Sequence, residues 1–204
     1  MTSLTKTFAL VAALAFAAPA AQANLVTNGS FDTNLTGWTL SQGGGCGTAG
    51  SLPYSAWVAN RAGHTGAVYL NACGHAGGDP NIVQTVSGLT IGTTYELEWD
   101  FIRDTLGQQG PRPDSFLVEL LGISGSPFEY DYVNNAVWQT NSLLFTATST
   151  NQSIRFSSEA NGTDASYYLD DVTLFAVPEP TSLALVGLGL LGAGMSRRKI
   201  LKPS

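Results

Sequence analysis

The chain has 204 residues, and its 15 acidic residues outnumber nine lysines and arginines, which gives a net charge of −6. Without its two apolar ends, the segment 24–176 keeps four arginines, no lysine and fourteen acidic residues. This balance excludes a nucleic-acid-binding surface, because phosphate groups are bound by basic faces. A segment of about 150 residues suits one domain with its own core.

The first 23 residues have the pattern of a secretory signal peptide. Lys6 precedes an apolar stretch at 8–18, and Ala21-Gln22-Ala23 is a small-x-small site, which predicts cleavage after Ala23 by signal peptidase. The alternative, a buried N-terminal helix, is disfavoured because Pro19 interrupts the apolar run. The chain is therefore predicted to be exported.

The body, residues 24–176, reads as a series of short strands. In "TYELEWDFI", Tyr95, Leu97, Trp99 and Phe101 alternate with acidic residues, which is the period of a half-buried strand. Further strands are predicted, between turns rich in Gly, Asn, Pro and Ser, at "GWTL", "YSAWVAN", "GAVYLN", "NIVQTVS", "SFLVELLG", "SLLFTATS", "QSIRFSSE" and "SYYLDDVTLF". No segment of the body has a helical period. The predicted fold class is all-β, an antiparallel β-sandwich.

Two cysteines, Cys46 and Cys73, lie in Gly-rich segments of the body. An even number of cysteines in an exported chain predicts a disulfide, which would stabilise the fold by roughly 3 kcal/mol in the loop-entropy model. The alternative is a metal site with His64, His75 or Asp79, but no C-x-x-C or H-x-x-x-H spacing supports it.

Short motifs at both ends of the body carry a resemblance to a known fold. The opening "NGSFD", the "GW" that follows it, and the closing "LDDVTL" resemble galactose-binding-like jelly rolls, which include several carbohydrate-binding modules. The segment "NIVQTVSGLTIGTTYELEWDF" resembles their middle part. The resemblance covers nearly all of 24–176 and implies a jelly-roll fold. It says less about activity, because one fold hosts many functions.

The same resemblance implies a structural calcium ion. Its ligands in this chain would be Asn28, Asp32 and Asp170, with the backbone carbonyl of Ser30 as a further donor. Hard oxygen ligands suit Ca²⁺, and the ion would join the first and last strands. The alternative is a turn at Asn28 and a solvated acidic pair at the end of the body.

The spacing of the closing motif also predicts a bulge. Leu169 and Val172 cannot share one face of a regular strand, so the acidic pair between them marks an extra residue. A bulge of this kind re-aims side chains and would favour the calcium site.

The segment "FEYDY" is the candidate glycan-binding site. Phe128, Tyr130 and Tyr132 share one face, and Glu129 and Asp131 lie on the other. An aromatic platform beside a carboxylate, here Asp131, would suit a sugar. The alternative is that the aromatic rings pack in the core.

No catalytic constellation is favoured. Glu96, Glu98 and Asp100 share a strand face about 7 Å apart, a spacing at which a glycosidase pair could stand. A solvated face is the simpler interpretation, so the body is predicted to be non-catalytic.

The C-terminal segment 177–204 differs from the body in composition and consists of three successive parts. Val177, Pro178, Glu179 and Pro180 precede sixteen uncharged residues at 181–196, which are followed by Arg197, Arg198 and Lys199. A helix of that length spans about 24 Å, short of the roughly 30 Å hydrocarbon core of a membrane, and the basic end would stay in the cytoplasm.

This order resembles the PEP-CTERM sorting signal of Gram-negative bacteria. The resemblance implies transient residence in the inner membrane, recognition of Pro-Glu-Pro by an exosortase, and transfer to the cell surface or an extracellular matrix in a biofilm setting. The alternative is a permanent membrane anchor.

Together these features predict an exported, non-catalytic protein with a signal peptide at 1–23, a β-sandwich at 24–176 and a sorting signal at 177–204. Its expected partners are signal peptidase, an exosortase and an extracellular polysaccharide. The alternative function is a structural or adhesive matrix protein without a small ligand.

We expect Cys46 and Cys73 to be bonded to each other in exported material. Alkylation before reduction, followed by mass spectrometry, should find neither thiol modified. Two alkylated thiols in the exported protein would refute the disulfide.

Overall fold

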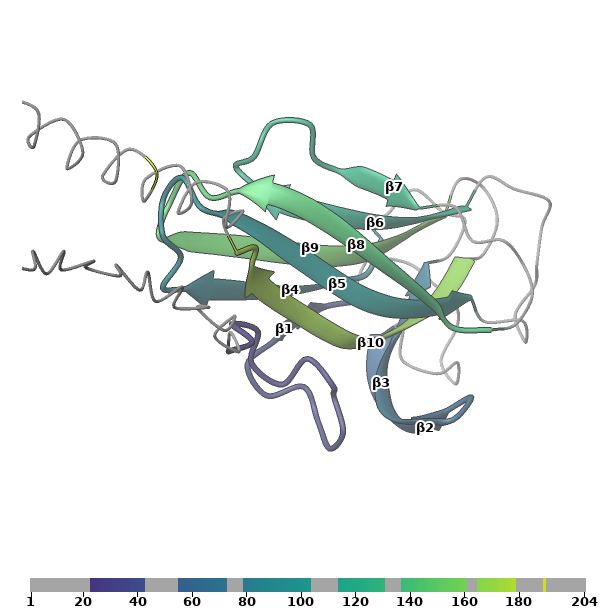
Figure 1. Cartoon of the computed structure of the whole chain (residues 1–204). Coiled ribbons are helices and arrows are strands. Elements are labelled where there is room, and N and C mark those ends of the chain that lie inside the picture. Colours follow the sequence, from purple (N-terminus) through teal and green to yellow (C-terminus); the bar gives the residue numbers. More distant parts are fainter. Residues whose placement is uncertain are drawn as a thin grey trace, which may run out of the picture.

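The computed structural model describes residues 23–42, 55–72, 79–103, 114–130, 137–160, 165–178 and 189. Within them the chain forms two five-stranded antiparallel sheets packed face to face (Figure 1). Sheet A has the strand order β1-β4-β9-β6-β7, and sheet B has the order β2-β3-β10-β5-β8. The predicted all-β sandwich is confirmed. The strands are β1 Thr39–Ser41, β2 Ser55–Arg61, β3 His64–Ala72, β4 Asn81–Ser87, β5 Thr94–Arg103, β6 Asp114–Leu121, β7 Phe128–Tyr130, β8 Gln139–Thr146, β9 Asn151–Ala160 and β10 Ala165–Ala176.

The core between the sheets is rich in aromatic rings. Tyr95 and Trp99 of β5 are at most 3% exposed, as the alternation in this segment predicted. Phe101 of sheet B stacks on Phe116 of sheet A with ring centroids 4.9 Å apart, and Trp99 contacts Phe156 of β9 at 5.8 Å. These contacts join the two sheets, and each buried ring removes roughly 150–250 Å² from water.

Strand β10 carries a bulge at its acidic pair. Its register with β5 shifts between Asp170 and Thr173, so two residues of β10 oppose one residue of β5. Asp171 takes a positive φ of 48° at this point. Leu169 and Val172 are consequently both fully buried. The bulge predicted from the sequence is confirmed.

The opening segment, residues 24–38, packs against this bulge. The backbone N–H of Val172 donates to the carbonyl oxygen of Gly29 at 2.9 Å. A Cβ at Gly29 would lie 1.9 Å from the Val172 oxygen, so the contact requires glycine. Phe31 is fully buried, and its ring lies 5.3 Å from that of Trp38. The motifs of the opening segment thus fix it to the last strand.

The two ends of the domain lie at the same end of the sandwich (Figure 1). The N–H of Leu25 donates to the Leu174 oxygen at 3.0 Å, and the Asn24 side chain accepts from the Leu174 N–H at 2.9 Å. The N–H of Val177 donates to the Thr94 oxygen at 2.8 Å. The chain is therefore held to the sandwich from Asn24 to Val177, and the Pro-Glu-Pro run begins one residue later.

Several predicted features fall outside the described residues. These are the signal peptide up to residue 22, the pair Cys46 and Cys73, and the sorting segment beyond Pro178 except Gly189. They stay predictions. Among the residues that the structure describes, no helix is long and apolar enough to cross a membrane.

The close approach of β3 to the opening segment predicts a sharp glycine requirement. A Cβ at Gly66 would lie 2.2 Å from the Phe31 oxygen, whereas a Cβ at Gly63 would meet nothing within 4 Å; both residues have positive φ. We expect Gly66→Ala to cost about 3 kcal/mol, from overpacking added to backbone strain, and Gly63→Ala about 1 kcal/mol from strain alone. Urea denaturation measures both variants, and equal losses would contradict the contact.

Candidate functional site

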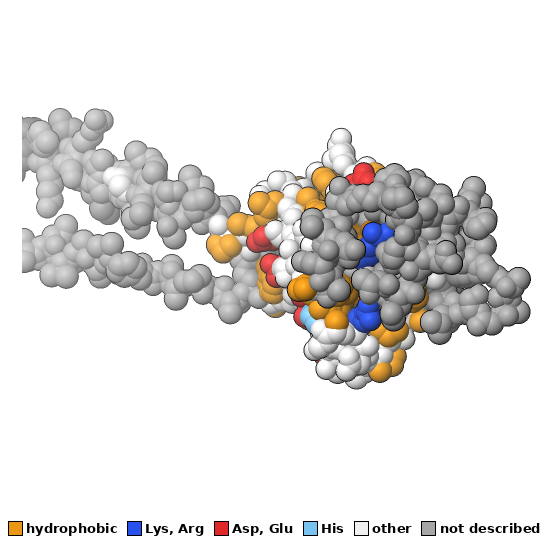
Figure 2. Space-filling model, turned by 90° about the vertical axis from the view of Figure 1, so that its right-hand side faces the viewer, with side chains coloured by type: hydrophobic (Ala, Val, Ile, Leu, Met, Phe, Trp, Pro, Cys, Tyr) orange, Lys and Arg blue, Asp and Glu red, His pale blue; other side chains and the backbone are white. Residues whose placement is uncertain are grey.

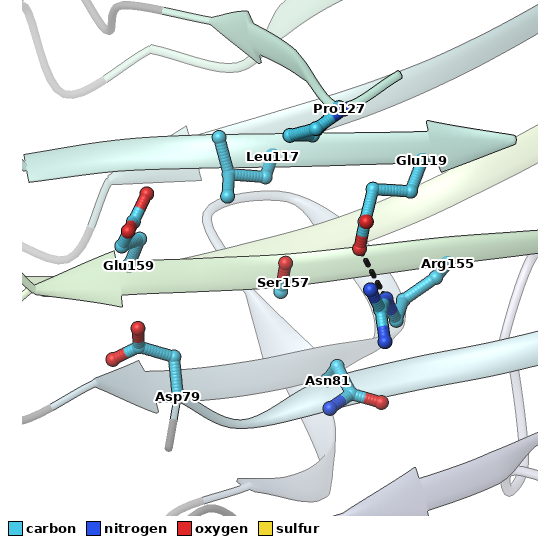
Figure 3. Close-up of a pocket in the computed structure, with 8 residues that line it drawn as sticks. All are labelled: Asp79, Asn81, Leu117, Glu119, Pro127, Arg155, Ser157 and Glu159. Atoms are coloured by element: carbon cyan, nitrogen blue, oxygen red, sulfur yellow. Dashed lines mark hydrogen bonds and ion pairs between the residues drawn. The ribbon is translucent and has the colours of Figure 1, made fainter. Parts of the chain in front are cut away.

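The outer face of sheet A carries a groove of about 260 Å³ (Figure 3). It spans β4, β9 and β6, and Pro127 from the β6–β7 connection reaches over one side. None of its eight lining residues is aromatic. They are Asp79, Asn81, Leu117, Glu119, Pro127, Arg155, Ser157 and Glu159.

Strand register arranges these residues in rows across the sheet. Ser157 of β9 pairs with Asn81 of β4 on one side and with Leu117 of β6 on the other, and this row forms the floor. Arg155 pairs with Glu119 in the next row. Adjacent rows on one face lie about 7 Å apart along a strand, so the walls at Arg155 and Glu159 stand about 13 Å apart on either side of the floor row.

Alternation on β9 separates the groove from the core. Ile154 and Phe156 are fully buried between the sheets, while Arg155 and Ser157 point to the outer face. Ser157 is only 8% exposed because larger side chains stand on either side of it. The small side chain of Ser157 between larger neighbours therefore forms the hollow in the outer face of the sheet.

The two walls of the groove differ in charge. On one side the Arg155 guanidinium is paired with Glu119 through its Nε. On the other side Glu159 stands near Asp79, without an arginine among the lining residues of that wall. Burial raises the pKa of Glu159, and the charges of Asp79 and Glu129 raise it further.

A second polar cluster lies on the outer face of sheet B at the bulge. His64 Nδ1 lies 2.7 Å from an Asp170 carboxylate oxygen and 3.7 Å from one of Asp171, and His64 Nε2 lies 3.9 Å from Asp100. The Trp138 ring stacks on the imidazole with centroids 4.1 Å apart. In Figure 2 the histidine surface, in pale blue, lies beside carboxylate atoms in red.

Asp170 is the most buried carboxylate of this cluster, with a residue exposure of 2%. Burial raises its pKa to about 6, although hydrogen bonds from the Asp171 N–H and from His64 act in the opposite direction. Burial also raises the pKa of Asp171; there His64 acts to lower it, and Asp100 and Asp32 raise it. The bulge thus holds a buried carboxylate next to an imidazole.

The aromatic segment 128–132 is only partly described. Phe128 and Tyr130 share a face as expected, but they are half-buried and pack against the core, and the Tyr130 ring meets Trp99 edge-on at 4.8 Å. Burial raises the pKa of the Tyr130 hydroxyl. This geometry favours core packing for both residues. Asp131 and Tyr132 lie outside the described residues, so their role in glycan binding stays a prediction.

The expected calcium ligands each have another partner in the structure. The Asn28 amide donates to the carbonyl oxygens of Asn34 and Thr36. Asp32 accepts from the Ser30 hydroxyl at 2.8 Å.

Asp170, the third expected ligand, binds His64. The group whose donor atoms lie within 4.8 Å of one another is His64, Asp170 and Asp171. Asp32 is nevertheless close enough to influence Asp171 electrostatically. The carboxylates at the bulge suit a hard cation, and calcium binding there stays a prediction.

Sequence reasoning missed the groove and the contact of His64 with Asp170, although it named His64 and Asp79 among the alternatives for a metal site. The period of "QSIRFSSE" places Arg155, Ser157 and Glu159 on one face, and this signal was available. Nothing local shows that Asn81 and Leu117 flank Ser157, because that depends on the sheet order β4-β9-β6. His64 reaches Asp170 only because β3 and β10 are neighbours.

Residues 176–199 match the PEP-CTERM protein-sorting motif, so the chain carries this signal of exported proteins sorted to the cell envelope. No curated protein matches the sequence.

The fold is similar to that of TmCBM61, solved in complex with β-1,4-galactotriose, with a TM-score of 0.54 and 18% identity over 76% of this chain and 99% of that one. It is also similar to part of an arabinose-bound α-L-arabinofuranosidase, MgGH51, with a TM-score of 0.53 and 13% identity over 76% and 26% of the two chains. A third similar structure is a putative sugar binding protein from Bacteroides thetaiotaomicron, with a TM-score of 0.51 and 12% identity over 76% and 100%. Carbohydrate-binding modules and an enzyme domain thus share this fold, and identities this low show the fold alone.

The raised pKa of Asp170 predicts a pH-dependent stability. Because the folded-state pKa of about 6 lies above the ordinary 3.8, the folded state keeps the proton more strongly and loses stability as pH rises between these values. In EDTA we expect Asp170→Asn to gain about 2 kcal/mol relative to wild type from pH 4 to 7. A constant difference between Asp170→Asn and wild type across this range would contradict the raised pKa.

The same variant tests the calcium prediction. Excess Ca²⁺ should raise the melting temperature of the wild type relative to EDTA and leave that of Asp170→Asn unchanged. Equal melting temperatures of the wild type in Ca²⁺ and in EDTA would contradict the predicted calcium site.

Proposed function

We propose that the groove of sheet A binds a polysaccharide outside the cell, and that the protein reaches that place through its PEP-CTERM signal. The observation that carries the proposal is the groove itself. It crosses three strands on the outer face of a sandwich whose fold is similar to carbohydrate-binding modules. The sorting motif supports the extracellular setting.

The chemistry of the floor suits a sugar. A sugar ring offers hydroxyl groups at its rim and C–H groups on its faces. The Asn81 amide and the Ser157 hydroxyl can exchange hydrogen bonds with the hydroxyls, and Leu117 offers an apolar contact. The volume of about 260 Å³ is near the lower end of ligand pockets, so we expect only a short stretch of the polysaccharide to make contact.

The sorting proposal follows from the end of the domain. Val177 is hydrogen-bonded to the sandwich, and Pro178 is exposed immediately after it. An inner-membrane exosortase would recognise Pro178, Glu179 and Pro180 and remove the segment that ends in Arg197, Arg198 and Lys199. The mature protein would then belong to the cell surface or the biofilm matrix of a Gram-negative bacterium and act without catalysis.

Filling the groove tests the binding proposal. Ser157→Tyr places a large ring on the outer face, where no core contact is lost. We expect it to weaken binding to the best ligand on a glycan array at least tenfold, or about 1.4 kcal/mol. Ser142→Tyr makes the same change on the outer face of sheet B and should leave binding intact.

Equal binding by the wild type and Ser157→Tyr would move the glycan site away from the groove. Lack of binding by the wild type to every glycan offered would favour the alternative, a structural or adhesive matrix protein.

Replacing Pro178, Glu179 and Pro180 with alanine tests the sorting proposal. Proline fixes φ and keeps the preceding residue out of the helical region, so its loss should extend the apolar helix and hide the processing site. The precursor should then accumulate in the inner membrane with its tail intact, as measured by fractionation and intact mass. A wild-type surface form that still carries residues 197–199 would show a permanent anchor instead.

A further inference from the structure

Three loops lie at the end of the sandwich from which both ends of the domain emerge (Figure 1). They follow β4, β6 and β8, and the strand register places the last residues of these strands beside the starts of β9 and β5. We call this surface the tethered end. It comprises residues 88–93, 121–125, 144 and 146–150.

A short stretch of chain limits how far the tethered end can stand from a membrane. The sorting motif begins at residue 176, which still belongs to β10. Val177 is hydrogen-bonded to Thr94, and the uncharged segment 181–196 starts four residues later. Four extended residues reach about 14 Å, and the headgroup layer on one side of a bilayer takes up roughly 5–8 Å. With segment 181–196 in the bilayer, less than about 10 Å would separate the tethered end from the headgroups.

The composition of the tethered end suits this position. Its residues are Gly, Ala, Ser, Thr, Leu and Ile, and none is charged, although the body contains fourteen acidic residues. Charged residues stand at the opposite ends of the same strands, where Asp79 precedes β4, Arg103 ends β5 and Glu159 lies near the end of β9. Negatively charged headgroups repel carboxylates, so the uncharged end is the one that can approach them.

The tethered end also exposes apolar side chains. Four large hydrophobic side chains are exposed in the part of the chain that the structure describes, and three of them lie here: Ile91 at 63%, Leu144 at 60% and Leu121 at 42%. The loop of Ile91 is held in place, because the Gly92 N–H donates to the Ala147 oxygen at 2.9 Å. Aliphatic side chains on a firm, hydroxyl-rich surface suit the boundary between headgroups and acyl chains.

We propose that the tethered end rests on the outer surface of the inner membrane while the sorting segment is in place. Its partner is the phospholipid surface, with Ile91 and Leu144 at the lipid interface and the charged end of the sandwich facing away. This docking keeps Pro178, Glu179 and Pro180 in the headgroup layer, within reach of a membrane-embedded processing enzyme. Removal of the segment ends the docking, because a few aliphatic side chains bind a membrane only weakly by themselves. The inference rests on the sorting part of the proposed function.

Tryptophan fluorescence tests the docking. The full chain is reconstituted into vesicles of phosphatidylethanolamine and phosphatidylglycerol, either plain or with brominated acyl chains, which quench tryptophan on contact. Ile91→Trp adds a tryptophan at the tethered end. Val137→Trp adds one at the opposite end, at a position that is 56% exposed. The emission of each variant minus that of the wild type isolates the added ring. We expect brominated lipid to quench this emission at least twofold for Ile91→Trp and not at all for Val137→Trp.

A charge placed at the tethered end should undo the contact. Leu144→Asp, combined with Ile91→Trp, puts a carboxylate where the headgroups would lie, so most of the quenching should disappear. Val137→Asp makes a similar change at the opposite end, and its combination with Ile91→Trp should keep the full quenching. Both aspartates replace exposed side chains, and equal melting temperatures of the two double variants check that the fold is retained.

Flotation of the vesicles separates the two proposals. If the wild-type chain does not float with the vesicles, segment 181–196 does not enter membranes, and the sorting proposal fails together with the docking. If the chain floats but the added emission of Ile91→Trp is not quenched, the sorting proposal stands and the docking is wrong. Equal quenching of Ile91→Trp and Val137→Trp would also overturn the docking, because the sandwich would then have no preferred orientation.

Discussion

The bulge in β10 is the constraint on which both ends of the domain depend. It turns Val172 back into the core and directs its N–H to the Gly29 carbonyl oxygen. The Val172 carbonyl oxygen lies too close for any side chain at residue 29. A regular strand would instead place Val172 on the outer face, because side chains alternate. One extra residue therefore docks the opening segment and also brings Asp170 and Asp171 to His64. Changes at the bulge would affect all three features at once.

The outer faces of the two sheets differ, because that of sheet B carries a compact polar cluster and that of sheet A carries an open groove. On sheet B the bulge fills the surface with a compact cluster in which His64, Asp170 and Trp138 satisfy one another. On sheet A the small Ser157 leaves an unfilled row between larger neighbours. Ligand binding requires surface groups that retain unfilled space, and this explains why the groove, rather than the better-connected cluster, is the candidate site for a polymer.

Local pattern predicted much of the fold and little of the site. The alternation around Trp99 predicted a strand, and the spacing of Leu169 and Val172 predicted the bulge. Both predictions were possible because the side-chain period of a strand can be read from a few neighbouring residues. Phe128 and Tyr130 do share one face, but a period of two does not tell which face is inner. Both residues pack against the core, Tyr130 on the ring of Trp99. The groove combines strands that are neighbours only through the sheet order, and no local pattern contains that information.

The continuity of β10 with the sorting segment has a mechanical consequence. β10 is the middle strand of sheet B, hydrogen-bonded to β3 on one side and to β5 on the other, and it leads within two residues to Pro178. Tension applied along β10 through that segment would act parallel to the strand and load both ladders in shear. Many hydrogen bonds must then break together, whereas peeling an edge strand breaks them one after another. We therefore expect unfolding by tension on β10 to require a larger force than unfolding by tension on an edge strand.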